Sequence, residues 1–240
     1  MTSFRERMKN TQEAANFTHE FVEVPPLRQV NTPNGRYYES EDGKKYFSVT
    51  TFLSKDKDKK KGLDAWRNAV GHKEADGIAN SSADRGENLH TIFERYLGNE
   101  KNYLKDASPI TKSMFYSLKP HLDENIDKIY GLELKLYSDY LKSAGTSDVI
   151  CSWSGKNTIL DFKNSRKHKT LEHVQGYFMQ SSAYAVMFEE RTGIPITQFV
   201  IAIACQDGTT QIFHGKRDDY IQEYKKFVDQ NYDDMMKLFS

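Results

Sequence analysis

The sequence contains little cysteine, no excess charge of either sign and no long apolar run. Its two cysteines, Cys151 and Cys205, are too few for a four-cysteine zinc or iron–sulfur site. Formal net charge is zero, with 34 basic and 34 acidic residues, so any nucleic-acid binding must rest on a local patch. No stretch approaches the roughly 20 apolar residues of a membrane helix, and the N-terminus lacks the apolar segment of a signal peptide. We therefore expect a cytoplasmic protein with no membrane partner.

The length and composition predict one folded unit preceded by an arm. With 240 residues, 38% hydrophobic and 12% aromatic, the chain is long enough to bury a real core. The polar residues 1–35 contain three prolines and are expected to form an extended N-terminal arm. Residues 36–240 are expected to form a single domain, with a hairpin and helical region over 36–130 and a catalytic core over 131–240. The default expectation for the oligomeric state is a monomer.

Hydrophobic periodicity predicts the order of the elements. Helices are predicted over residues 49–53, 63–80, 82–97, 110–130, 171–192 and 218–239, with Pro120 at a kink or break. Strands are predicted over residues 36–39, 45–48, 133–138, 148–153, 157–163, 196–205 and 210–214. This order predicts an α/β or α+β fold in which helices flank a mixed central sheet and a helical region precedes the core.

One strand-turn-strand segment gathers acidic residues and a lysine. Asp148 opens the first predicted strand, and Asp161 and Lys163 close the second. Because the turn between them is short, the strands pair antiparallel, and the start of the first lies beside the end of the second. The side chains of Asp161 and Lys163 share one face of the strand, whereas Phe162 points to the other face and into the core.

Two converging carboxylates suit Mg²⁺ or Mn²⁺, which bind oxygen ligands and retain waters for a substrate phosphate. The ammonium group of Lys163 would orient or activate the attacking water and stabilise charge on the phosphate. This pattern is typical of metal-assisted phosphodiester hydrolysis. On the residues alone, an alternative stays open, in which Asp148 caps a turn and Asp161 and Lys163 form a surface ion pair.

Three further residues are candidates for the same site. Glu133 begins the preceding predicted strand and either supplies a third carboxylate or faces solvent. His90 and Glu94 share one face of the helix predicted over 82–97, so Glu94 either holds His90 or binds metal through water. A single helical histidine is otherwise more often structural.

Two segments after Lys163 are candidate DNA contacts. Tyr177, Gln180 and Tyr184 lie on one helix face together with His173, which suits stacking or hydrogen bonding to a nucleic-acid strand. The alternative is a polar stripe at the edge of the core. The run NSRKHK over 164–169 adjoins the lysine, which favours phosphate contacts by Ser165, Arg166, Lys167 and Lys169.

The segment AGTSDVICSWSGKNTILDFKNSRK resembles the RecB-like branch of the PD-(D/E)xK nucleases. It is most similar to the mitochondrial genome maintenance exonucleases and their phage-encoded relatives, including those of cyanophages. The group's GxxD, hairpin and (I/V)D(F/W)K(T/N)S pattern reads GTSD and LDFKNS here. The RGxxxH motif, which includes Arg85 and is followed by Glu94, reads RGENLH, and the Q-x3-Y helix contains Gln180 and Tyr184. An SVTT segment and the glutamate of Leu132-Glu133-Leu134 also match.

The resemblance implies a restriction-endonuclease-like core with a Mg²⁺ or Mn²⁺ site. By similarity, His90, Asp148, Asp161 and the backbone carbonyl of Phe162 hold the metal, and Lys163 is the catalytic lysine. Gln180 and Tyr184 would support the site or the DNA, and Glu133 is an extra acid near the metal. Asn164 stands where relatives commonly have threonine. The four cysteines of the iron–sulfur branch are absent, so no cluster is expected.

The function expected from this resemblance is a DNA exonuclease that acts on single-stranded ends, in phage DNA replication or recombination or in DNA degradation. If the chain is phage-encoded, it would work in the host cytoplasm. The helical region around residues 63–130 would arch over the sheet and thread a single strand. The alternatives are a flap or branched-DNA endonuclease, a nuclease acting on RNA, and a non-catalytic DNA-binding recombination partner.

Overall fold

The computed structural model describes residues 15–239, so the first 14 residues of the predicted arm lie outside the described part. The helices are α2 (Val49–Leu53), α3 (Lys57–Val70), α4 (His72–Leu97), α5 (Pro109–Asn125), α6 (Leu171–Thr192) and α7 (Arg217–Phe239). The strands are β1 (Thr18–His19), β2 (Leu27–Thr32), β3 (Gly35–Ser40), β4 (Lys45–Ser48), β5 (Ile126–Ser138), β6 (Ser143–Trp153), β7 (Lys156–Ser165), β8 (Gln198–Cys205) and β9 (Thr210–Lys216). No helix in this described part has an apolar span long enough to cross a bilayer.

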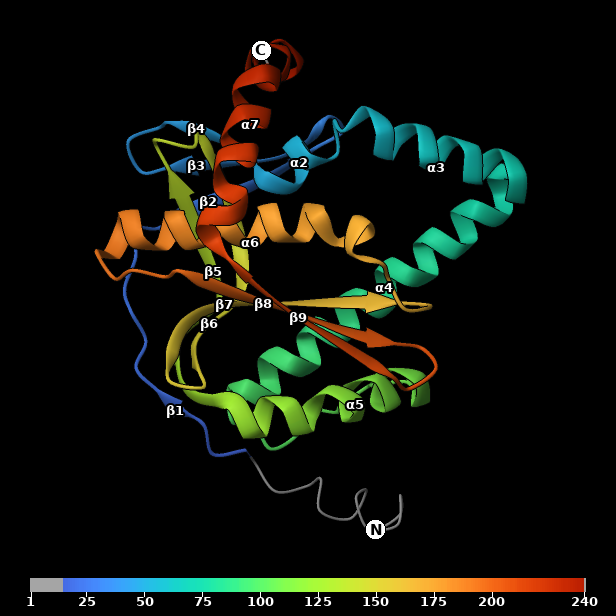
Figure 1. Ribbon diagram of the computed structural model, residues 1–240, viewed down its shortest axis with the longest axis vertical. Coiled ribbons are helices and arrows are strands. Elements are labelled where there is room, and N and C mark those ends of the chain that lie inside the picture. The colour runs from blue at the N-terminus through green and yellow to red at the C-terminus, as the bar shows by residue number, and fades with distance from the viewer. Residues whose placement is uncertain (1–14, 240) are drawn as a thin grey trace.

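All the described strands belong to one mixed sheet (Figure 1). The main path runs β2-β3-β4-β6-β7-β8-β9, and β5 pairs with β6 and β1. The β6–β7 hairpin is antiparallel, whereas β7 pairs with β8 in parallel through the crossover helix α6. Helices lie on both faces of the sheet, which confirms the predicted fold class.

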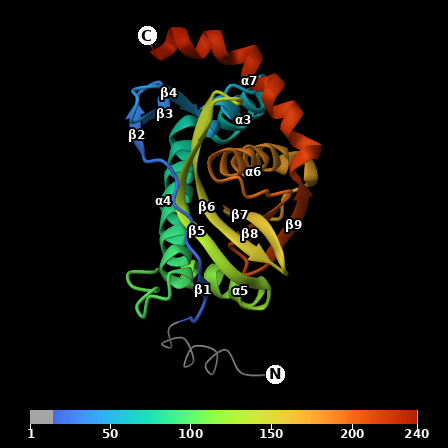
Figure 2. The same ribbon diagram turned by 90° about the vertical axis from the view of Figure 1, so that its left-hand side faces the viewer.

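Two apolar cores fill the spaces between the sheet and its helices. On one face, α2, α6 and α7 pack over Ile150, Ile159 and Ile201. On the other face, α4 and α5 pack over Val149, Leu160 and other side chains of alternate residues. Figure 2 shows α4 and α6 on opposite sides of the strands. Strands β7 and β8 are therefore apolar on both faces, which is why their sequences read as nearly continuous hydrophobic runs.

The sheet divides at one point, which we call the fork. Hydrogen-bonded pairing between β6 and β7 runs from Trp153–Lys156 to Val149–Leu160 and ends there. Beyond the fork, β6 continues beside β5 and then β4, while β7 continues beside β8 as far as Ser165. The prediction that Asp148 opens its strand is wrong, because β6 begins at Ser143 and residues 143–147 pair with β5 rather than with β7. The prediction that the carboxylates of Asp148 and Asp161 lie close together is confirmed, since the two residues directly follow the last β6–β7 pair on either side of the fork.

Two predicted helix boundaries are also wrong. The helices predicted over 63–80 and 82–97 are α3 and α4, which are separated at Gly71, where φ is +97°. Glycine adopts this angle without steric cost, whereas the serines at the predicted break continue the helix. The helix predicted over 110–130 ends at Asn125, because Ile126 and the residues after it pair with β6. Pro120 lies inside α5 and does not end it.

Residues before the first predicted hairpin join the sheet as well. Leu27–Thr32 form β2 and pair antiparallel with β3. Thr18 and His19 pair in parallel with β5, and His19 Nε2 lies 2.7 Å from the carbonyl oxygen of Leu97. The segment therefore covers the exposed edge of β5, whose unpaired backbone groups would otherwise face solvent.

Helix α4 is attached to the end of β7 by a close contact at Gly86. A Cβ atom at this position would lie 2.7 Å from Nδ2 of Asn164. The same amide donates to the carbonyl oxygen of Ser82 at 2.9 Å and accepts from the Ser82 hydroxyl at 3.4 Å. On the same strand face, two residues earlier, the ring of Phe162 stacks on Phe93 of α4 at a centroid separation of 4.0 Å. These contacts fix the position of α4 relative to the fork.

Two glycines of α4 provide a matched pair for testing this contact. Gly77→Ala should raise the free energy of unfolding by up to about 1 kcal/mol, because alanine favours the helix and nothing lies within 4 Å of its added Cβ. Gly86→Ala should raise the free energy of unfolding by less than Gly77→Ala does, or lower it. The reason is that the Asn164 amide must move and give up its hydrogen bonds to Ser82. Urea denaturation of the two variants measures the difference, and equal stabilisation would contradict the contact.

Candidate active site

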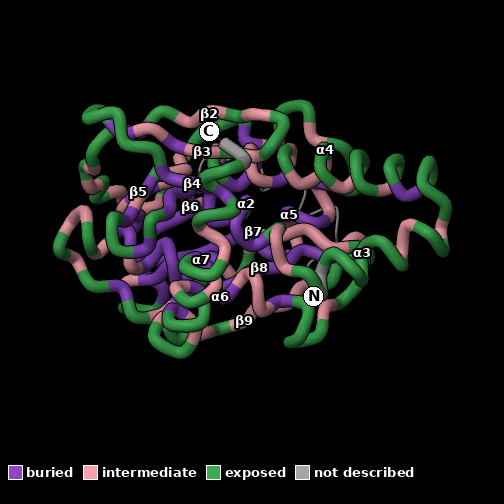
Figure 3. Tube along the Cα trace, turned by 90° about the horizontal axis from the view of Figure 1, so that it is seen from above, coloured by how far each residue is buried: buried purple, intermediate pink, exposed green. Residues whose placement is uncertain are grey.

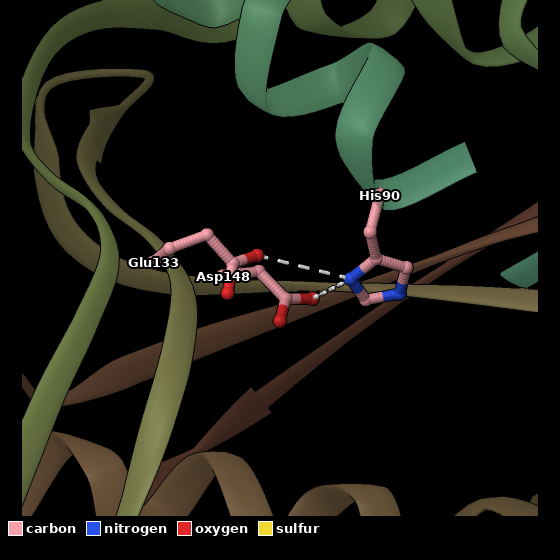
Figure 4. Close-up of side chains that lie close together, drawn as sticks. All are labelled: His90, Glu133 and Asp148. Carbon is pink, nitrogen blue, oxygen red and sulfur yellow. Dashed lines mark ion pairs between the residues drawn. The ribbon is translucent and has the colours of Figure 1, made fainter. Parts of the chain in front are cut away.

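Three side chains from three elements converge at the fork (Figure 4). His90 comes from α4, Glu133 from β5 and Asp148 from β6. The imidazole Nδ1 lies 3.6 Å from Asp148 Oδ2 and 4.0 Å from Glu133 Oε1. One ligand atom from each residue lies within 4.8 Å of those of the other two. Such a group of one nitrogen and two carboxylate oxygens can hold a metal ion.

Local backbone geometry aims Glu133 at this point. It lies between the Leu132–Val149 and Leu134–Ser147 pairs, at the level of Asp148. Its φ is +46°, a left-handed conformation that is uncommon outside glycine. Strained backbone of this kind costs about 1–3 kcal/mol and gathers at functional sites. A regular strand does not adopt this angle, so the backbone irregularity occurs at the residue that contributes to the acidic cluster.

Asp161 and Lys163 form an ion pair beside this cluster. Lys163 Nζ lies 2.5 Å from Asp161 Oδ2, and Asp161 is only 1% exposed. Asp148 is tied to the same strand because its Oδ2 accepts from the backbone N–H of Phe162 at 2.7 Å. The structure thus groups Asp148 with His90 and Glu133, while the oxygens of Asp161 face Lys163 and Gln180.

Helix α6 supports Asp161 from the opposite side. Gln180 Nε2 donates to Asp161 Oδ1 at 3.2 Å and to the hydroxyl oxygen of Tyr184 at 3.3 Å. The ring of Tyr184 packs on β6 at Gly145, where an added Cβ would lie 2.4 Å from a ring carbon. Gly145 of the GTSD segment therefore provides the space for Tyr184, which in turn holds Gln180 in place.

The ionisation of the acidic groups follows from their crowding and burial. Burial, followed by the charges of Asp148, Glu94 and Asp161, raises the pKa of Glu133 to about 8. Burial raises the pKa of Asp161 to about 6, against the opposing effect of Lys163. The neighbouring carboxylates raise the pKa of Lys163 despite its burial, so its amine stays protonated at neutral pH. A cation at the cluster would relieve the repulsion among these carboxylates.

The other residues predicted to support the site or to contact DNA each have neighbours of their own. The ammonium Nζ of Lys163 lies over the ring of Tyr177, 5.1 Å from the ring centroid. With the side-chain amide of Gln206 turned so that its oxygen faces the guanidinium, Arg85 Nη2 donates to that oxygen at 2.6 Å. Glu94 is exposed on α4 but close enough to raise the pKa of Glu133. His173 contacts Thr170 at the start of α6, with Nδ1 2.7 Å from its hydroxyl.

The basic loop after Lys163 is anchored to β9. Both backbone groups of Lys169 bond the side-chain amide of Gln211, at 2.7 and 3.0 Å, and Ser165 donates to the carbonyl oxygen of Lys167 at 2.5 Å. Arg166 and Lys167 are exposed. The loop thus presents cations to solvent on a fixed backbone, at the end of the strand that carries Lys163.

The donor set of the cluster fits a divalent metal. Carboxylate oxygens are the preferred ligands of Mg²⁺ and Mn²⁺, and imidazole is more readily accepted by a transition metal than by Mg²⁺. His90, Glu133 and Asp148 would supply these ligands. Asp161 and the carbonyl of Phe162, which the sequence predicted as ligands, lie next to them on β7. Their part in metal binding stays a prediction.

Known proteins give little further guidance. No family model matches the chain. No curated protein sequence matches it either. Among solved structures, the chain is similar to a crystal structure from Eubacterium rectale named "putative exonuclease", at 15% identity and a TM-score of 0.47. The similarity covers 64% of this chain and 67% of that one.

Sequence reasoning missed the residues that hold the site together. Gly86 and Gly145 are both needed for close packing, against Asn164 and Tyr184 respectively. Both glycines belong to the RGENLH and GTSD segments, so their place in the motifs was a usable signal. The pairing of Asn164 with Ser82, 82 residues apart, had no signal in a single sequence.

The raised pKa of Glu133 makes stability depend on pH. Its carboxyl ionises near 4.5 in the unfolded chain but near pH 8 in the fold, so the folded state retains a proton that the unfolded state has lost. The free energy of unfolding should therefore fall as pH rises from about 4.5 to about 8. Glu133→Gln removes this contribution, and its stability advantage over the wild type should grow across that interval.

Thermal denaturation in EDTA at several pH values between 5 and 9 measures this difference. Asp161 adds a dependence of the same sign at lower pH, but it is present in both proteins. A melting-temperature difference between variant and wild type that does not change with pH would show that Glu133 ionises normally in the fold.

Proposed function

We propose that the protein is a metal-dependent deoxyribonuclease that hydrolyses phosphodiester bonds at the fork between β6 and β7. The observation that carries the proposal is the convergence of His90, Glu133 and Asp148 beside the buried Asp161–Lys163 pair. The order of these residues along the chain matches the pattern of the PD-(D/E)xK nucleases, which supports the same assignment.

Each protein group has a task that its environment suits. Lys163, held as an ammonium ion by Asp161, donates to a phosphate oxygen and orients the attacking water. Gln180 fixes Asp161, which keeps Lys163 in one position. Glu133 is the third member of the acidic cluster, beside His90 and Asp148, and a bound cation would keep its carboxylate ionised. A bound Mg²⁺ or Mn²⁺ would act as a Lewis acid and lower the pKa of that water.

The preferred substrate in this proposal is a single-stranded DNA end. The α3–α4 hairpin projects from the body next to the site, and Figure 3 shows that most of its residues are exposed or half-buried. Its position supports a path for one strand between the hairpin and α6. The exposed Arg166 and Lys167 lie at the end of β7, where they would attract the DNA backbone in a chain without net charge.

The first test is digestion of end-labelled single-stranded DNA with Mg²⁺ or Mn²⁺. The wild type should degrade it only with metal, and Asp161→Asn should lose at least about 100-fold in rate. Lys163→Ala should lose activity similarly but bind DNA within a few-fold of the wild type, because it removes one phosphate contact among several. Lys156→Ala, at the exposed start of the same strand, is the matched control and should retain activity. Normal cleavage by Asp161→Asn would refute the site.

A second test separates ends from internal bonds. Linear and circular single-stranded DNA of the same sequence are incubated with enzyme and Mn²⁺. An exonuclease should degrade the linear form and leave the circle intact, because a circle offers no end to enter the site. Efficient cutting of circles would favour the endonuclease alternative, and binding without cleavage of either form would favour the non-catalytic alternative.

A further inference from the structure

A cavity of about 400 Å³ lies beside the ion pair, on the side away from the acidic cluster's helix α4. Its walls come from α2, α3 and α6, and Lys163 of β7 contributes to the lining. Only Lys163, Tyr177 and Gln180 of the lining belong to the proposed catalytic machinery. The remaining lining residues are Thr50, Leu53, Ser54, Lys60, Leu63 and Gly176. The volume falls within the roughly 300–1,000 Å³ of small-molecule sites.

One wall of this cavity carries an apolar side chain that is not needed for the packing of the core. Leu63 is 51% exposed on α3, a helix that projects from the body and adds no residue to the apolar cores of the described chain. The same cavity is lined by Leu53, which is buried, and by Tyr177, which is partly exposed. An exposed leucine and an aromatic ring in the wall of one cavity are suited to contact a flat apolar group bound there.

Gly176 leaves room for such a group. It lies inside α6, where glycine costs about 1 kcal/mol relative to alanine, and it lines the cavity. Its missing side chain keeps the wall of α6 open next to Tyr177.

The cationic side chains of the cavity indicate that the flat group carries an anion. Lys60 and Lys163 contribute the cationic side chains of the lining, and its other polar groups are hydroxyls and one amide. Hydroxyls both donate and accept, so they can meet the edge of any base. A planar ring with a polar edge, joined to an anion, is the chemistry of a nucleotide.

We propose that this cavity binds one unstacked nucleobase of the DNA strand, next to the phosphodiester at Lys163. This inference rests on the proposed nuclease function and deepens it. A base enters the cavity only after it leaves the stack, which costs little in a single strand and several kcal/mol in a duplex. The pocket therefore selects single-stranded DNA at the bond that is cut.

The test uses a labelled single-stranded oligonucleotide with one internal abasic site, digested by the wild type with Mn²⁺. Stacking of the base is lost when the abasic nucleotide reaches the cavity, so cleavage should slow roughly tenfold at one bond in fixed register with that site. Digestion before and after this bond should proceed at the normal rate. A uniform rate across the abasic site would overturn the pocket and leave the nuclease proposal standing.

A filling variant gives the reciprocal result. Gly176→Phe places a ring in the cavity, so it should slow cleavage of every bond roughly tenfold and abolish the pause at the abasic site. The matched control is Gly77→Phe on α4, where nothing lies within 4 Å of an added Cβ, and it should keep both the rate and the pause. Circular dichroism checks that Gly176→Phe is folded, and a folded variant that still pauses at the abasic site would overturn the proposal.

If the wild type cuts no DNA with any divalent metal, the proposed function fails and binding decides the pocket. Fluorescence anisotropy then compares a ten-nucleotide oligothymidylate with the same backbone lacking one base at each position in turn. The pocket requires a roughly tenfold weaker Kd for at least one abasic position, and a loss of that difference in Gly176→Phe. Equal Kd values at all positions would overturn it.

Discussion

The ion pair between Asp161 and Lys163 is the constraint around which the site is built. A carboxylate at the end of an apolar strand, almost fully removed from water, is costly unless a cation and hydrogen-bond donors face it. Lys163 supplies the cation and Gln180 supplies the donor. Because both partners must remain in place, β7 and α6 keep a fixed relation, and the crossover helix that joins β7 to β8 becomes part of the site's support.

The fork turns this local pair into a site that can hold a metal ion. Where β6 separates from β7, the backbone hydrogen bonds between the two strands end, and side chains from both faces of the sheet reach this gap. His90 arrives from the α4 face and Gln180 from the α6 face. Close contacts at Gly86 and Gly145 fix the two helices, so each side chain meets the strands at a set distance. The left-handed backbone at Glu133 completes the acidic cluster at some cost in stability.

Charge is distributed to match this arrangement. The chain has no net charge, and its acidic cluster would by itself repel a phosphate. Lys163 lies beside it and the exposed Arg166 and Lys167 follow at the end of β7, so in the proposed function an incoming strand would meet cations as well as carboxylates. If the cavity beside Lys163 takes a base as proposed, its contacts to that base would not depend on salt. In the proposed function, binding and hydrolysis are thus divided between neighbouring groups.

The sequence by itself determined the elements whose signals are local. The helix over 171–192 was predicted with its observed bounds, because its periodicity is clear and Gly193 ends it in a left-handed conformation. The pattern of Asp148, Asp161 and Lys163 indicated one site, because a short turn and a two-residue period leave few arrangements for the hairpin. Tertiary structure decided the rest. Ile126 and its neighbours became a strand through pairing with β6, and Asp161 faces Lys163 and Gln180 through burial under α6. The cavity next to Lys163 exists only because α2, α3 and α6 meet there. Such contacts join residues far apart in the chain, and no local propensity encodes them.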